Sequence, residues 1–261
     1  MVTLTNENES NIQSLVVLVR SLLMCVNPVP EALTVLCADE QVESRLKQLL
    51  PKQINIKRYN LKRTSDVYFV KFLLNEYVFE YPTLTTEILY IDPDHVCLRN
   101  FQLSTGNGLH VSSELHTYEK DDMAAVESIF PAMQFNSHHF NTSFICGHSD
   151  LWRRLALPWR NAYEKIVGKV DFRHREEIAY TAGCGLSNIP CEPVSPTVQS
   201  NFSIFSPECS LFHYGGDYES AKKLKALMRD ADTRKARLTA MLRTSSTDVE
   251  AFIARAMLDL I

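Results

Sequence analysis

The sequence lacks the paired cysteines that mark a disulfide framework or a structural zinc site. Its seven cysteines are scattered singly, no two of them form a CxxC pair, and several lie within apolar runs. Free thiols in such runs pack like small hydrophobic side chains. We therefore expect buried free thiols in a reducing compartment, and a cytoplasmic protein.

Two further absences narrow the class of protein. No run of about 18 uncharged apolar residues occurs, since the nearest candidate, 15–29, contains Arg20 and ends at Asn27-Pro28. The residues before it are acidic, unlike those of a secretory signal. The net charge is -4, which disfavours a protein that binds mainly through nucleic-acid phosphates. We expect no membrane span and a globular chain.

The first part of the chain alternates β-prone apolar runs with amphipathic stretches. This pattern indicates βαβ units, and hence a parallel sheet with helices on both faces. Ligands of such sheets bind beyond the carboxyl ends of the strands, where Asn6 and Asp92 fall. We predict strands at 1–5, 33–38, 53–59 and 87–92, and helices at 12–26, 40–50 and 65–79, the second of them capped by Asp39.

The second part of the chain is less regular. We predict strands at 108–112, 140–146 and 210–214, helices at 123–130, 150–167 and 174–181, and a loop with one short strand over 183–201. From 218 onward the chain is helical and amphipathic. The expected organisation is one main domain, 1–217, divided into two parts, 1–101 and 102–217. A helical extension, 218–261, would follow and could mediate homo-oligomerisation.

The segment Asp92-Pro93-Asp94 ends an apolar run and places two carboxylates one residue apart. In an extended backbone, side chains at positions i and i+2 point the same way. Two converging carboxylates suit Mg²⁺ or Mn²⁺, which bind substrate phosphates as well. The alternative is a simple turn, because Asp-Pro-Asp is favourable turn chemistry.

Several segments together resemble glycosyltransferases of the GT-A fold, in particular the glycogenin-like and bacterial galactosyltransferase-like group, family 8. The segments, in chain order, are Val2–Asn6, the helix with Lys71 and Tyr77, Ile88–Val96, Phe140–Ile145, Arg175–Ala179 and Phe212–Gly215. Two departures stand out: Ser143 replaces a usual glycine, and the family's Lys-Pro-Trp ending is absent. The resemblance implies a single α/β GT-A (Rossmann-like) domain with a mostly parallel central sheet and C-terminal helices. It makes 1–217 the catalytic domain, with 1–101 as the nucleotide-binding half and 102–217 as the acceptor half.

The resemblance also implies an activity and a set of site residues. The activity is metal-dependent transfer of a sugar from a nucleoside-diphosphate sugar, with retention of configuration. The implied ligands of Mn²⁺ or Mg²⁺ are Asp92, Asp94 and His213. The implied donor-binding residues are Leu4, Thr5, Asn6, Lys71, Ile91, Asp92 and Lys222, and the implied catalytic residues are Asn141, Glu176 and Glu177.

Other interpretations of these residues stay open. His213 could be an ordinary histidine before a turn, Asn141 could bridge backbone groups, and the Glu176-Glu177 pair could be a solvated helix face. A sugar nucleotidyltransferase is disfavoured, because that class needs a glycine-rich basic loop and residues 6–10 are acidic and free of glycine. A catalytically inactive binding or assembly protein of the same fold is the main alternative. The acceptor is open among glycans, proteins, small molecules and modified bases.

Overall fold

The computed structural model divides the described chain into two compact units. The first unit contains Met1–Val2, Leu61–Ile91 and Leu103–Val194, and the second contains Thr3–Asn60, Asp92–Gln102 and Ser195–Ile261. The boundary predicted between 217 and 218, and the predicted helix start near 65, lie outside the described residues. The structure describes residues 1–26, 32–61, 68–83, 86–103, 106–117, 120–131, 138–169, 175–215, 222–223, 226, 234–244 and 248–258.

The strands confirm the predicted α/β class and a mostly parallel central sheet. In the described residues, seven strands are hydrogen-bonded in the order β3-β2-β1-β4-β7-β6-β8. The pairs β2–β3, β1–β4 and β6–β8 are parallel, whereas β7 runs antiparallel to both β4 and β6. The bounds are β1 (Val2–Leu4), β2 (Thr34–Cys37), β3 (Asn55–Arg58), β4 (Glu87–Ile91), β6 (Leu109–Thr117), β7 (His138–His148) and β8 (Cys191–Pro193).

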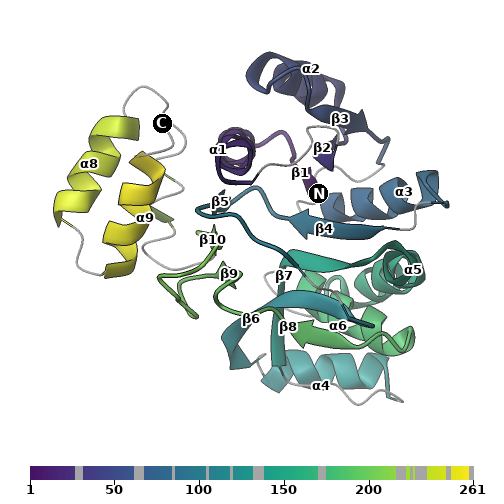
Figure 1. Ribbon diagram of the computed structural model, residues 1–261. Helices are drawn as coiled ribbons and strands as arrows, with labels where there is room; N and C mark the ends of the chain where they lie inside the picture. The colour runs from purple at the N-terminus through teal and green to yellow at the C-terminus, as the bar shows by residue number, and fades with distance from the viewer. Residues whose placement is uncertain are drawn as a thin grey trace. The chain divides into compact units, whose positions relative to one another are not determined.

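Helix α5 (Ser149–Ile166) is central to the first unit. It packs against α3 (Leu73–Glu80), α6 (Arg175–Leu186) and the strands β4 and β7, and α4 (Lys120–Ile129) also contacts it (Figure 1). Its buried face carries Trp159, whose ring packs edge-on against Phe72 and Tyr180. The indole of Trp152 donates to the carbonyl of Ile88 at 3.2 Å, so α5 is fixed against β4.

The first two helices of the second unit begin at side-chain caps. Helix α1 (Glu9–Cys25) begins after Asn8, whose side-chain oxygen accepts from the amide of Ser10. Helix α2 (Glu40–Leu49) begins after Asp39, whose carboxylate accepts from two first-turn amides. The cap predicted at Asp39 is therefore confirmed, and it satisfies amides that no helical carbonyl reaches.

A second sheet in this unit was not expected from the sequence. It has the order β5-β10-β9, with β5 (His95–Cys97) antiparallel to β10 (Leu211–His213), which in turn is parallel to β9 (Gln199–Ser200). The sequence predicts the segment of β10 but no strand at the position of β5. Strand β5 has only three residues, too few for an alternating pattern to emerge.

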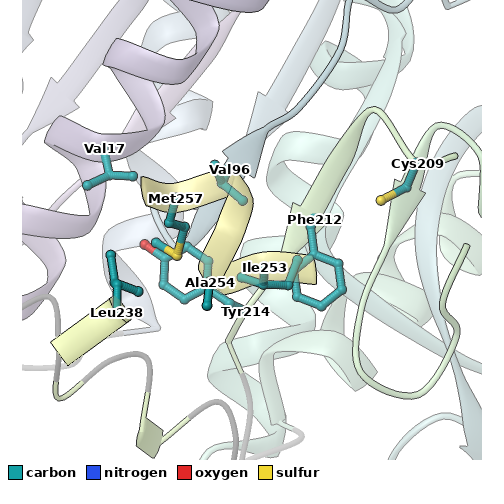
Figure 2. Packing of buried hydrophobic residues seen from close by; sticks show 9 residues of the cluster. All are labelled: Val17, Val96, Cys209, Phe212, Tyr214, Leu238, Ile253, Ala254 and Met257. Carbon is teal, nitrogen blue, oxygen red and sulfur yellow. The ribbon is translucent and has the colours of Figure 1, made fainter. Parts of the chain in front are cut away.

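The C-terminal helices α8 (Arg234–Thr244) and α9 (Asp248–Leu258) complete the core of the second unit (Figure 2). Their apolar side chains pack with residues from α1, β5 and β10 in one buried cluster: Val17, Val96, Cys209, Phe212, Tyr214, Leu238, Ile253, Ala254 and Met257. Among the helices that the structure describes, none combines the length and the apolar character needed to cross a membrane.

Candidate metal centre and polar cluster

The Asp-Pro-Asp segment forms the turn between β4 and β5. Strand β4 ends at Ile91, the backbone bends at Pro93 and Asp94, and β5 begins at His95. The amide of Tyr214 donates to the carbonyl of Asp94 at 3.0 Å, which ties this turn to the end of β10. The turn and the site hypothesis are therefore compatible, because the turn itself brings Asp94 to β10.

Asp94, His95 and His213 form a group whose potential ligand atoms all lie within 4.8 Å of one another. His95 and His213 are opposite each other in the antiparallel pair of β5 and β10. The Nε2 atom of His213 lies 3.3 Å from Oδ1 of Asp94. His95 is fully buried and His213 is 5% exposed, so the surrounding fold holds both rings.

Gly215 leaves the space that this group needs. A Cβ atom at this position would overlap Nε2 of His213 and Oδ2 of Asp94. One neutral imidazole nitrogen and one carboxylate oxygen facing the same space form a donor set that suits a divalent transition metal such as Mn²⁺. These residues therefore fit the metal that the resemblance implies.

Asp92, the third predicted ligand, is not a member of this group. Its side chain is half-buried in the turn, and its backbone carbonyl oxygen lies 3.1 Å from Nδ1 of His95. The structure thus brings Asp94 and His213 together, and His95, which sequence analysis did not select, lies with them.

A second polar cluster lies within the first unit, around Lys71. The ammonium of Lys71 lies 3.1 Å from Oε2 of Glu176 and donates to the hydroxyl of Thr142 at 2.8 Å. The Thr142 hydroxyl in turn donates to Oε2 of Glu176 at 2.5 Å. Glu176 is 1% exposed and Lys71 is 9% exposed. This buried charge pair therefore joins the short 3-10 helix Phe69–Phe72, which directly precedes α3, to α6.

Asn141 is held next to this cluster by two hydrogen bonds. Its amide nitrogen donates to Oε1 of Glu114 at 2.8 Å, and its side-chain oxygen accepts from the amide of Ser143 at 2.9 Å. Ser143 itself is 1% exposed. Asn141 therefore has a fixed orientation, partly through a backbone bridge of the kind that the alternative interpretation expected.

Glu177 differs from Glu176 in exposure, because its side chain is only half-buried. Burial raises the pKa of the Tyr68 phenol to about 12, and the negative charge of Glu177 adds to this increase. Arg175 lies between two aromatic rings, 5.7 Å from the centroid of Tyr68 and 5.4 Å from that of Tyr163. The phenol of Tyr68 therefore stays protonated at neutral pH, beside charges of both signs.

The remaining predicted donor-binding residues occupy varied positions. Leu4 and Thr5 are buried at the end of β1, and the side-chain oxygen of Asn6 accepts from the amide of Asn8 and the side chain of Asn11. Ile91 is buried and pairs with Phe144 of β7. Lys222 is exposed.

Three residues of these clusters were missed by sequence analysis. His95 follows the Asp-Pro-Asp segment directly, and Thr142 follows Asn141, so both were adjacent to recognised motifs. No sequence pattern indicates Glu114, because its contact with Asn141 depends on the pairing of β6 with β7.

Comparison with known proteins identifies solved structures of the same fold. An active-site mutant of LgtC matches with a TM-score of 0.59 and 14% identity over 84% of this chain and 89% of its own. Apo mouse xyloside xylosyltransferase 1 matches with a TM-score of 0.52 and 13% identity over 81% and 96%. No protein-family model and no curated protein sequence matches the chain. The predicted GT-A glycosyltransferase fold is confirmed.

Proposed function

We propose that this protein is a metal-dependent glycosyltransferase that transfers a sugar from a nucleoside-diphosphate sugar to an acceptor with retention of configuration. The observation that carries the proposal is that the side chains of Asp94 and His213 lie close together beside Gly215, in a chain with the GT-A fold. The acceptor is a glycan, a protein, a small molecule or a modified base.

The proposed ligands of Mn²⁺ or Mg²⁺ are Asp94 and His213, with Asp92 as the third. Such a cation, when bound, neutralises the charge that develops on the departing diphosphate. Asp94 is held by its backbone bond to Tyr214, and His213 by its place in β10. Both ligands therefore need little rearrangement, which favours binding. Leu4, Thr5, Asn6, Ile91 and Lys222 are the proposed contacts to the nucleotide.

The buried pair of Lys71 and Glu176 supports retention over inversion. An inverting enzyme needs a carboxylate that is free to take the acceptor's proton. Glu176 is nearly inaccessible and already accepts from Thr142 beside the Lys71 ammonium. We assign Glu176 the role of orienting Lys71, and Asn141 that of a fixed polar contact. Only if transfer inverts would half-buried Glu177 act as the base.

The transfer breaks one bond and forms another at the anomeric carbon. The bond from this carbon to the diphosphate oxygen breaks, and its electron pair leaves with the nucleoside diphosphate. A bond to the acceptor oxygen forms, and the acceptor's hydroxyl proton passes to the departing phosphate. Under retention, no protein base is required.

The proposal is tested by nucleotide release from a panel of nucleoside-diphosphate sugars. We expect release with Mn²⁺, its loss with chelator, and its loss in Asp94→Asn and His213→Phe. Asp150→Asn changes a carboxylate of 63% exposure on α5 and serves as the matched control. Release that persists in chelator and in Asp94→Asn would refute the metal role.

The main alternative is a non-catalytic protein of this fold, and binding measurements distinguish the two. A ligand present at 100 times its dissociation constant stabilises the folded state by about 2.7 kcal/mol. We expect such a shift of the unfolding midpoint with a nucleoside diphosphate and Mn²⁺. A shift without any transfer, with all donors and a broad set of acceptors, would favour the binding protein.

A further inference from the structure

His95 belongs to the candidate metal group, yet its contacts distinguish it from the other two residues. Its ring is stacked on that of His213, with centroids 4.6 Å apart and planes 14° apart. Its Nδ1 atom lies 3.1 Å from the carbonyl oxygen of Asp92, and its Nε2 atom lies 3.5 Å from Nε2 of Gln199. Both ring nitrogens therefore face polar groups of the protein.

The contact with Asp92 determines where the imidazole proton lies. A carbonyl oxygen only accepts hydrogen bonds, so Nδ1 of His95 must carry the proton and donate it. In the neutral ring, Nε2 is then the acceptor.

The contact with Gln199 requires the same form of the ring. The amide nitrogen of Gln199 donates to the carbonyl of Ser200 at 3.3 Å, and turning the amide over would set two oxygens against each other. The nitrogen, with its second hydrogen, therefore faces Nε2 of His95. Gln199 is 3% exposed, so water does not readily replace this contact. Two independent partners thus select one tautomer and occupy both ring nitrogens.

We propose that His95 is a positioning residue that holds His213 and the Asp92–Asp94 turn for the cation, and that it does not itself bind the ion. This inference rests on the proposed metal-binding function. The stacked ring of His95 limits rotation of the His213 ring, and its Nδ1–H bond fixes the carbonyl at the start of the turn. Partners behind metal ligands commonly act in this way, by fixing the orientation of the ligands.

The inference is tested without any substrate, in the full chain labelled with ¹⁵N at histidine and loaded with ¹¹³Cd²⁺. We expect coupling between cadmium and a ring nitrogen of His213. We expect none at His95, whose nitrogen shifts should report a proton on Nδ1 before and after loading. Cadmium coupling at His95, or a proton on its Nε2, would overturn the inference.

Variants provide a second readout. In His95→Phe, which keeps an aromatic ring and removes both nitrogens, we expect the dissociation constant of Mn²⁺ to rise about 10- to 100-fold. The nitrogen hyperfine coupling of bound Mn²⁺, from one histidine, should persist. His148→Asn, at the start of α5, serves as the control and should leave the affinity unchanged. Unchanged affinity in His95→Phe would also overturn the inference.

The outcomes separate this inference from the proposed function. Cadmium coupling at His213 without any sugar transfer refutes the transferase and leaves the role of His95 intact. Coupling at both histidines refutes the inference and leaves the transferase intact. Coupling at neither ring refutes the metal role and, with it, the role of His95.

Discussion

The ammonium of Lys71 and a carboxylate oxygen of Glu176 lie 3.1 Å apart, and both residues are buried from solvent. Removing two charges from water is costly, and their attraction offsets that cost only when further hydrogen bonds satisfy them. Thr142 supplies such bonds through both its hydroxyl and its carbonyl oxygen. The pair is therefore a structural element whose partners depend on each other.

Replacement of Lys71 by Met should leave the Glu176 carboxylate buried without its ammonium partner. We expect the free energy of unfolding to fall by about 3–5 kcal/mol, measured by urea denaturation. The double variant Lys71→Met/Glu176→Gln should be more stable than Lys71→Met alone. Arg45→Met, which breaks an exposed pair with Glu9, is the control and should cost less than about 1 kcal/mol. An unchanged midpoint for Lys71→Met would contradict this account.

Substitution of Gly215 by Ala should act on metal binding. The added Cβ would overlap Nε2 of His213 and Oδ2 of Asp94, so these side chains must separate. We expect the Mn²⁺ affinity to fall at least about tenfold, measured by calorimetry, as for displaced ligand geometry. Gly106→Ala is the matched control, because a Cβ there meets nothing within 4 Å. Equal affinities of the two variants would show that the space at Gly215 is irrelevant to the ion.

Cys191 should be the most reactive thiol of the native protein. A hydrogen bond from Cys184 chiefly lowers the pKa of Cys191, although burial opposes it. Cys25 is likewise half-buried, but burial raises the pKa of its thiol. Because the thiolate is the reactive form, a lowered pKa gives a larger reactive fraction at a given pH. We expect iodoacetamide near neutral pH to label Cys191 before Cys25, as measured by peptide mass spectrometry.

The buried cysteines supply the internal control for that experiment. Burial raises the pKa of Cys37 and of Cys146 to about 12, so both should remain unlabelled until the chain unfolds. The labelling rate of Cys191 should increase with pH and level off at a lower pH than that of a free thiol. Preferential labelling of Cys25 would disprove the assignment.

Ile253 should contribute strongly to stability although it lies close to the end of the chain. Its side chain is fully buried in the cluster of Figure 2, among residues of β5 and β10. Truncation of such a side chain to Ala costs about 2–5 kcal/mol. Arg255→Ala, on the exposed side of the same helix, should change the stability by less than about 0.5 kcal/mol. Thermal unfolding of both variants tests the difference.

The features that sequence analysis predicted correctly depend on neighbours in the chain. The cap at Asp39 satisfies amides two and three residues away, so a short pattern contains all the needed information. The strands and helices of the first part likewise follow from local periodicity. Asp94 was recognised because it ends an apolar run.

The features that were missed depend on pairing between distant segments. Strand β5 is too short to show a pattern and exists because β10 pairs with it. The antiparallel insertion of β7 beside β4 has no local signal either. His95 looks like any histidine after a turn until Gln199 and Asp92 are seen to engage its two nitrogens. Sequence order alone does not specify which distant residues contact one another.

The pairing of His95 with His213 has a consequence for how the protein matures. The two strands are far apart in the sequence, and closing so long a loop is entropically costly, so β10 should dock late in folding. During synthesis, the turn at Asp94 leaves the ribosome long before His213 does. Capture of the proposed metal would then require that synthesis has passed β10, so a chain terminated before His213 should bind no ion.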